Sequence, residues 1–216
     1  MRAPIPHKPA PRIPLSVKVA YTAFVCVLVP YHWVAYTPWN FLYFCDIALL
    51  VTLAAVWLES AFLVSTQAVA IVLAQLIWVA DFATHSHITG MTGYMFKREI
   101  PLFVRGLSLF HGWLPFLLLY LLARLGYDHR AFGAQSIAAV AVLLVCYFLA
   151  PGPAALVAHP NAAVNINYVY GFDDAHPQTR IAPGFWVGLL MAFNVMCLYL
   201  PTHASLRKIF APACPR

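Results

Sequence analysis

Long apolar runs dominate the chain, and short polar stretches separate them. Each run is close to the ~20 residues that a helix needs to cross the ~30 Å hydrocarbon core of a bilayer. The pattern predicts six membrane-spanning helices, at residues 16–36, 39–58, 61–82, 102–125, 131–150 and 181–203. The expected fold class is therefore all-α, a polytopic membrane protein.

The spans leave no room for a separate soluble domain. We expect a six-helix transmembrane domain over residues 16–210, preceded by a disordered, proline-rich tail (1–15) and followed by a short tail (211–216). Composition agrees, because 62% of the residues are hydrophobic and 9% are charged, with a mean hydropathy of +0.77. Soluble domains are typically about 25% charged.

The basic residues predict an orientation. If the N-terminus is cytoplasmic, nine of the 13 Lys and Arg residues fall on the inner side: Arg2, Lys8, Arg12, Lys18, Arg124, Arg130, Arg207, Lys208 and Arg216. Because cytoplasmic segments carry an excess of Lys and Arg, we expect both termini to be cytoplasmic. Anionic lipid headgroups account for the net charge of +6. We therefore expect membrane lipids as partners and no nucleic acid.

The two loops expected on the outer side are long, at residues 83–101 and 151–180. Long ordered loops in compact proteins often carry function. The second contains Val164, Ile166 and Val169, which are poorly suited to water, so we expect it to pack back against the helices and line a cavity.

Polar residues gather in the outer half of the predicted bundle. His111 lies ~15 Å below Pro101, and Asp46 lies ~12 Å deep on the second span. Gln75 and Asp81 lie in the outer half of the third span. Because three spans carry polar stripes at the same end, we expect an outward-opening pocket between spans 2, 3 and 4.

Residue type and depth in the bilayer indicate which of these residues are functional. A Ser or Gln in a span often only bonds a neighbouring helix, whereas an Asp or His near the bilayer centre costs at least ~2.5 kcal/mol and is usually functional. The candidate catalytic residues are His111, Asp46, Asp81, Ser108 and Cys45. Arg105, Gln75 and His85 are candidates for substrate binding.

Three chemistries could use such a pocket. In acyl transfer or hydrolysis, His111 would deprotonate a hydroxyl or thiol and an Asp would orient the imidazole. In a metal site, Asp81, His85, His87 and His111 could supply ligands, although two of these histidines lie past the expected helix end. The third is ligand binding or transport without chemistry. The cysteines match no zinc spacing, and we expect neither a metal nor another cofactor.

Two segments carry a resemblance to a known family. They are "FHGWLPFLLLYLL" (residues 110–122) and "NINYVYGFDDAHPQTRIAPGFW" (residues 165–186). Together they resemble the YwaF-type, TMEM164-like family of integral membrane proteins over less than half of the chain. The resemblance implies a multi-pass protein of the bacterial inner membrane that acts on lipid acyl chains. It also implies a site formed by His111 with Asn165, Asn167 and Tyr168.

The leading hypothesis is thus a membrane enzyme for lipid acyl transfer or acyl-ester hydrolysis, centred on His111. The alternative is a non-catalytic protein that binds or transports a lipid or small molecule.

Overall fold

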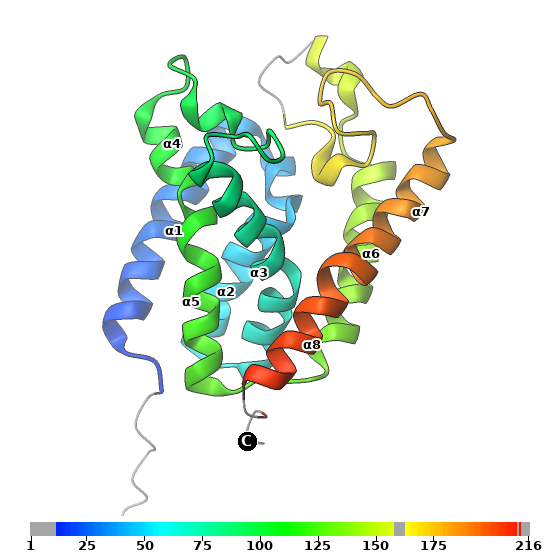
Figure 1. Cartoon of the computed structure of the whole chain (residues 1–216). Coiled ribbons are helices and arrows are strands. Elements are labelled where there is room, and N and C mark those ends of the chain that lie inside the picture. The colour runs from blue at the N-terminus through cyan, green and yellow to red at the C-terminus, as the bar shows by residue number, and fades with distance from the viewer. Residues whose placement is uncertain (1–11, 158–162, 211, 213–216) are drawn as a thin grey trace, which may run out of the picture.

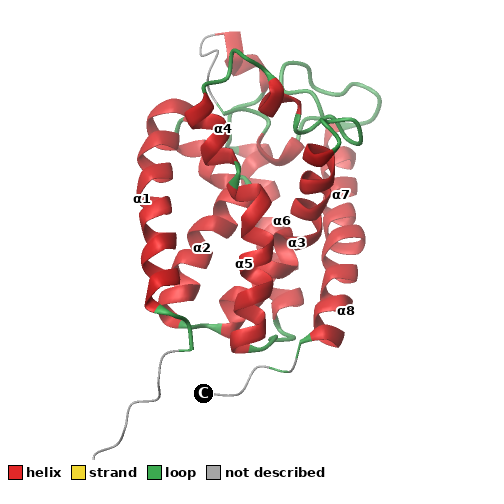
Figure 2. Ribbon diagram, turned by 60° about the vertical axis from the view of Figure 1, so that its left-hand side comes forward, coloured by secondary structure: helices red, strands yellow, loops and turns green. Residues whose placement is uncertain are grey.

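The computed structural model describes residues 12–157, 163–210 and 212, and they form a bundle of helices (Figures 1 and 2). Apart from one isolated bridge between Tyr127 and Pro212, these residues contain no β-structure. The all-α prediction is confirmed. Most of the predicted tails, together with five residues of the second long loop, lie outside the described residues.

The helical elements follow one another along the chain without a repeated unit. Their bounds are α1 Leu15–Tyr36, η1 Pro38–Leu42, α2 Phe44–Leu58, α3 Ala61–Ala83, η2 Gly93–Phe96, α4 Leu102–Ser108, α5 Phe110–Leu125, α6 Ala131–Phe148, η3 Pro153–Val157, η4 Ile166–Tyr168, α7 Pro183–Phe193, η5 Asn194–Tyr199 and α8 Leu200–Ile209.

Five helical stretches in the described residues are long and apolar enough to cross a membrane: Leu15–Tyr36, Ala61–Ala83, Leu102–Leu125, Ala131–Phe148 and Pro183–Ile209. They correspond to five of the six predicted spans, and they make the chain a multi-pass membrane protein.

The remaining predicted span, 39–58, is interrupted. Thr37 has a positive φ of 73°, and Tyr43 is extended between η1 and α2. Pro38 opens η1 and has no N–H to continue the helix from α1. Only the 15 residues of α2 remain as a regular helix, fewer than the ~20 that a full crossing needs.

α3 is the central helix. It packs against α2, α5 and α6. Of the residues in its most apolar 18-residue stretch, 61% are buried, compared with 17% for the corresponding stretch of α1. A helix that is apolar on all sides is stable where other helices surround it. Gln75, Trp78 and Asp81 are therefore carried by the best-enclosed element of the molecule.

α4 and α5 form one kinked span. At the junction, the Gly112 N–H bonds the carbonyl of Leu109 at 2.9 Å, three residues back, instead of the carbonyl of Ser108, four residues back. The last span differs too, because α7, the π-helical turn η5 and α8 run on to Ile209, past the predicted end at residue 203.

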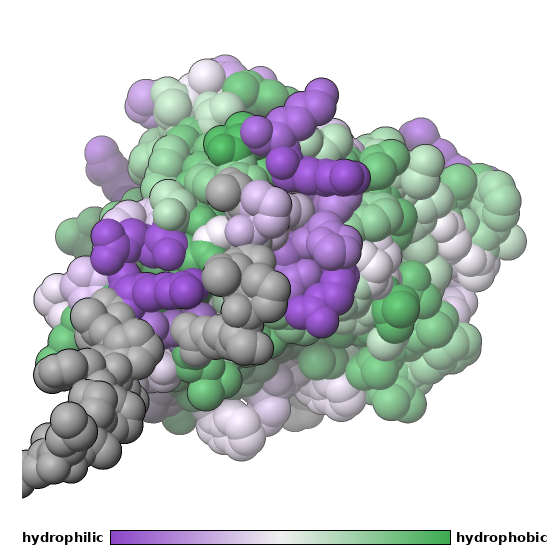
Figure 3. Space-filling model, turned by 90° about the horizontal axis from the view of Figure 1, so that it is seen from below, coloured by the Kyte–Doolittle hydropathy of each residue, from purple (hydrophilic) through white to green (hydrophobic). Residues whose placement is uncertain are grey.

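The two ends of the bundle carry different parts of the chain. The long loops gather at one end, which we call the loop end, and α3 and α6 begin at the other, where both described chain ends also lie (Figure 1). At this second end, Arg124 Nε donates to the Arg12 carbonyl at 2.8 Å. Viewed from below, polar side chains gather there among apolar ones (Figure 3).

Candidate functional site

His111 occupies the kink between α4 and α5. Its Nδ1 lies 2.8 Å from the Ser108 carbonyl, which the kink leaves without its usual helical donor. A carbonyl oxygen can only accept, so Nδ1 must carry the proton. In the neutral ring, Nε2 then holds the lone pair, and it has no hydrogen-bond partner among the described residues. The backbone thus selects the tautomer in which Nε2 can act as a base.

The ring of His111 is held between helices. It stacks on Trp78 of α3, with ring centroids 5.4 Å apart and planes 22° apart. Trp78 is 6% exposed, so the imidazole is held against a buried, rigid surface. This contact places the His111 ring against α3.

A second polar cluster lies where α1, η1 and α2 meet. Asp46 Oδ1 lies 3.2 Å from His32 Nδ1, and Asn40 Nδ2 donates to Asp46 Oδ2 at 3.3 Å. Cys45 Sγ contacts the same Oδ2 at 3.8 Å. The contact between Oδ1 and Nδ1 is not aligned as a hydrogen bond, so it is chiefly electrostatic. Asn40 Nδ2 also lies 3.1 Å from His32 Nδ1, so one amide contacts both the imidazole and the carboxylate.

The cluster around Asp46 interacts electrostatically with His111. Asp46 and His32 both lie within electrostatic range of His111. Of the two predicted carboxylate partners, Asp46 is therefore the one that the structure brings toward the imidazole.

Tyrosines from both long loops reach the same region. Burial raises the pKa of Tyr94, in η2, to about 12, although the nearby polar groups of Ser108 and Trp78 oppose the increase. Burial also raises the pKa of Tyr168, and Asp174 and then Cys45 contribute to that rise. Both phenols therefore stay protonated at neutral pH and can donate hydrogen bonds.

Gln75 lies one helical turn from Trp78 on α3. Its side chain is 3% exposed, and neither its Oε1 nor its Nε2 has a hydrogen-bond partner among the described residues. An enclosed amide without partners costs about 1–3 kcal/mol. Arg105 is only partly satisfied. Its Nη1 donates to the Met95 carbonyl at 3.2 Å, but its Nε has no hydrogen-bond partner among these residues.

Asp81 has a different role from the one predicted as a partner of His111. Its Oδ1 accepts from the backbone N–H groups of Ile88, Thr89 and Gly90, at 3.0, 2.6 and 3.2 Å. Its Oδ2 accepts from the backbone and the hydroxyl of Thr92, at 2.9 and 2.7 Å. The carboxylate therefore organises the first long loop.

The asparagines of the second long loop hold the backbone. Asn165 Nδ2 donates to the Gly171 carbonyl at 2.9 Å. Asn167 accepts from the Phe44 N–H at 3.1 Å and donates to the Leu42 carbonyl at 2.8 Å, which joins the loop to η1 and α2. Both have positive φ values, of 50° and 56°, which Asn tolerates better than most residues. These bonds account for the shape of the loop, and ligand binding by these amides stays a prediction.

The second long loop packs as predicted. Val164, Ile166 and Val169 are 4%, 0% and 1% exposed, so this part of the loop is buried against the helices. Tyr168 is 39% exposed and lies at the rim.

The residues of the metal hypothesis do not converge. His85 is exposed beyond the end of α3 and stacks on Phe96 at 5.0 Å, and His87 contacts the Thr84 carbonyl. Across residues 12–157, 163–210 and 212, no group of three or more His, Cys, Asp or Glu side chains lies close enough to hold one ion.

Sequence reasoning did not assign roles to His32, Asn40 or Tyr94. His32 and Asn40 contact Asp46, so the depth argument that singled out Asp46 applies to them as well. Tyr94 lies in a loop, where neither depth nor helical phase applies, so no sequence signal pointed to it.

Comparison with protein-family models, with curated proteins and with solved structures found no match.

Proposed function

We propose that this chain is an integral membrane enzyme that transfers or hydrolyses lipid acyl groups, with His111 as the general base. The observation that carries the proposal is the bond from Nδ1 to the Ser108 carbonyl, which leaves Nε2 as the acceptor, with Asp46 within electrostatic range of the ring. In Ser–His–Asp enzymes a carboxylate selects the tautomer, and here a backbone carbonyl has that role.

The chemical step follows from this tautomer. A hydroxyl, thiol or water attacks the carbonyl carbon of an acyl ester while its proton moves to His111 Nε2. The tetrahedral oxyanion then collapses, the ester C–O bond breaks, and the proton passes from Nε2 to the leaving alkoxide. Ser108 and Cys45 remain the candidate nucleophiles, and a water molecule serves in the hydrolytic case.

Gln75 and Asp46 support this chemistry in different ways. The unpartnered Gln75 amide supplies a preorganised donor for a substrate carbonyl or an oxyanion. Asp46, within electrostatic range of His111, favours the imidazolium that forms during the step.

The proposal includes a membrane arrangement. η1 and α2 together make a sixth crossing, with both termini in the cytoplasm and the loop end outside. The resemblance to the YwaF-type family supports the same class of activity and a bacterial inner membrane location.

The decisive variant is His111→Gln. Glutamine can keep one hydrogen bond but cannot accept a proton at neutral pH, so we expect release of fatty acid from a fluorogenic phospholipid to fall by about 100-fold or more. His129→Gln, an exposed change in the loop between α5 and α6, is the matched control and should retain full activity. Equal turnover by both variants, with unchanged melting temperatures, would contradict a catalytic role for His111.

One observation also favours the non-catalytic alternative. A bound lipid or small molecule would satisfy the Gln75 amide without any reaction. If purified protein in liposomes binds a phospholipid stoichiometrically yet releases neither fatty acid nor a transferred acyl product, the binding function stands and the enzyme does not.

A further inference from the structure

A cavity opens between α2, α3 and α6, away from the contacts of His111. Its volume is about 270 Å³. Its lining residues on α2, α3 and α6 include Phe62, Leu63 and Ala138 and the polar Thr66, Gln67 and Gln135. Apart from these three polar residues, the whole lining is apolar.

The cavity opens sideways, toward the bilayer. Thr66, Gln67 and Gln135 are buried, whereas the apolar lining residues on α2 and α6 are only partly buried and Ala138 is exposed. The lining on α6 runs from Ala134 to Val142, or ~12 Å along the helix. A lateral, elongated and apolar opening in a membrane-spanning bundle matches a lipid acyl chain.

A fixed cation lies at one end of this cavity. The Arg130 guanidinium sits over the ring of the lining residue Phe62, 5.4 Å from its centroid. Its side chain is 71% exposed at the start of α6. This is the end of the bundle where α3 also begins, so the cation lies at the depth of lipid headgroups.

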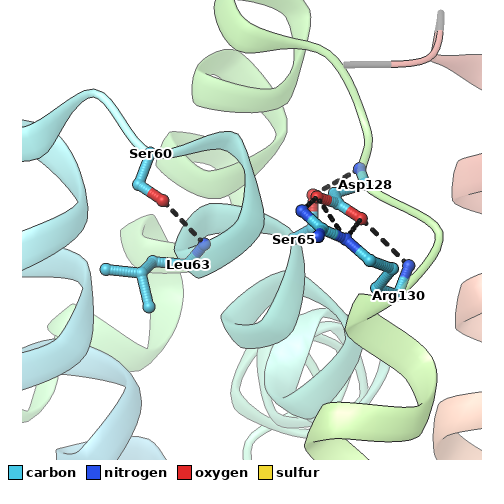
Figure 4. A network of polar contacts seen from close by, with 5 residues as sticks. All are labelled: Ser60, Leu63, Ser65, Asp128 and Arg130. Atoms are coloured by element: carbon cyan, nitrogen blue, oxygen red, sulfur yellow. Dashed lines mark hydrogen bonds and ion pairs between the residues drawn. The ribbon is translucent and has the colours of Figure 1, made fainter. Parts of the chain in front are cut away.

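The orientation of this cation is built into the fold. Arg130 Nη2 donates to Asp128 Oδ2 at 2.7 Å, and the Asp128 N–H donates to Ser65 Oγ on α3 at 2.9 Å. Figure 4 shows these contacts together with the bond from the Leu63 N–H to Ser60 Oγ, the N-cap of α3. Leu63 lines the cavity.

Asp128 does not use all the donors of Arg130. A guanidinium has five N–H groups, and the contacts with Asp128 involve Nε and Nη2. The Nη1 donors make no bond to a described residue, so an anionic oxygen can share the guanidinium with Asp128.

We propose that this cavity is a binding site for one phospholipid, with one acyl chain between α2, α3 and α6 and the phosphate on Arg130. The site does not depend on the chemistry proposed for His111, and its test does not measure turnover.

The test uses the full chain in lipid nanodiscs that contain phosphatidylglycerol with a photoactivatable diazirine in one acyl chain. After illumination, mass spectrometry maps the labelled residues. We expect labelling of α2, α3 and α6 at the cavity, and about fivefold less labelling with a diacylglycerol probe that carries the same chain but no phosphate.

Two pairs of variants make the test specific. Ala138→Trp fills the cavity and should abolish its labelling, whereas Ile137→Trp adds the same bulk to a neighbouring, 74% exposed residue of α6 and should not. Arg130→Gln should lower labelling about fivefold, and Arg130→Lys, which keeps the charge, should restore most of it. Melting temperatures identify any variant that has lost its fold.

Equal cavity labelling of Ala138→Trp and Ile137→Trp would overturn the site. Labelling that falls in Ala138→Trp but is equal for Arg130→Gln and wild type, or equal for the two probes, would overturn the assignment of the ligand as a phospholipid.

Discussion

A histidine within a membrane-spanning helix needs partners for its polar ring, and His111 finds one in its own backbone. The kink at Leu109 leaves the Ser108 carbonyl without its helical donor, and the imidazole N–H takes that place at 2.8 Å. A local irregularity of the helix therefore determines the tautomer of the residue, and with it the chemistry that Nε2 can perform.

At the residue scale, a substitution of Gln75 tests directly whether its amide lacks a partner. Because its amide is enclosed without a partner, Gln75→Leu should leave the free energy of unfolding unchanged or raise it by about 1–3 kcal/mol. The same change should weaken the binding of any ligand that the amide contacts. Thermal unfolding in detergent, with and without phospholipid, measures both effects.

Gln67→Leu is the matched control. Gln67 is equally buried on the same helix, but its Nε2 donates to Thr66 Oγ1 at 3.0 Å, so this change should lower stability. If both variants lose the same stability, the Gln75 amide is bonded in the folded protein and its proposed role in binding is wrong.

At the scale of elements, the long loop after α3 depends on a single carboxylate. The Asp81 carboxylate accepts hydrogen bonds from the backbone N–H groups of residues 88–90 and Thr92, and Asp81 is completely buried. A carboxylate can accept on both oxygens, whereas an amide has one oxygen and would direct N–H groups at other donors.

Asp81→Asn should therefore loosen this loop while the bundle stays folded. We expect hydrogen exchange of the amides at residues 88–92 to become faster, corresponding to a local loss of about 1–3 kcal/mol. Glu99→Gln, an exposed change in the same loop, should leave exchange unchanged. Unaltered protection in Asp81→Asn would show that these bonds do not hold the loop.

At the scale of the whole molecule, Glu59 joins the start of the bundle to the turn between α2 and α3. It accepts from Lys18 Nζ at 3.0 Å and from the backbone N–H groups of Arg12 and Ile13 at 3.1 and 3.2 Å. Burial raises the pKa of Glu59, but these hydrogen bonds outweigh it and lower the pKa from 4.5 to about 2.

This shift predicts a pH dependence of stability. Well above pH 4.5 the carboxylate is ionised in both folded and unfolded protein, so its contribution is complete. As the pH falls from 4.5 toward about 2, the unfolded chain takes up the proton first and the contribution is lost. Melting temperatures across this range should fall more steeply for wild type than for Glu59→Gln, and parallel curves would contradict the role of Glu59.

Membrane orientation is also a property of the whole molecule. Both described chain ends lie at the same end of the bundle, where Arg124, Arg130, Arg207 and Lys208 also gather. Because basic residues favour the cytoplasm, a C-terminal phosphatase fusion, active only outside the cytoplasm, should be inactive, and the same fusion in the loop after α3 should be active. The opposite pattern would reverse the proposed orientation.

Several features could be predicted from the sequence because they depend on local composition. Apolar runs near 20 residues identify membrane-spanning helices whatever their neighbours are, since every backbone N–H in the bilayer core must be bonded within its own segment. The burial of Val164, Ile166 and Val169 followed from the same cost of exposing apolar side chains.

Other features were decided only by tertiary structure. Depth placed both Asp46 and Asp81 at the level of the site, but the side of the helix on which each carboxylate finds donors determines its role. Asp46 meets His32 of α1, whereas Asp81 is surrounded by the loop that follows it. Depth is a property of one helix, and direction depends on how the helices pack.

The interruption of the second span and the lateral cavity both depend on contacts between segments that are far apart in the sequence. Asn167 bonds the Phe44 N–H across 123 positions of sequence, and α2, α3 and α6 meet around Ala138 only in the folded bundle. The sequence by itself determined that the chain folds as helices in a membrane with polar groups toward one end. Tertiary packing decided which of those groups meet, because hydrophobic patterning acts along the chain and contacts form across it.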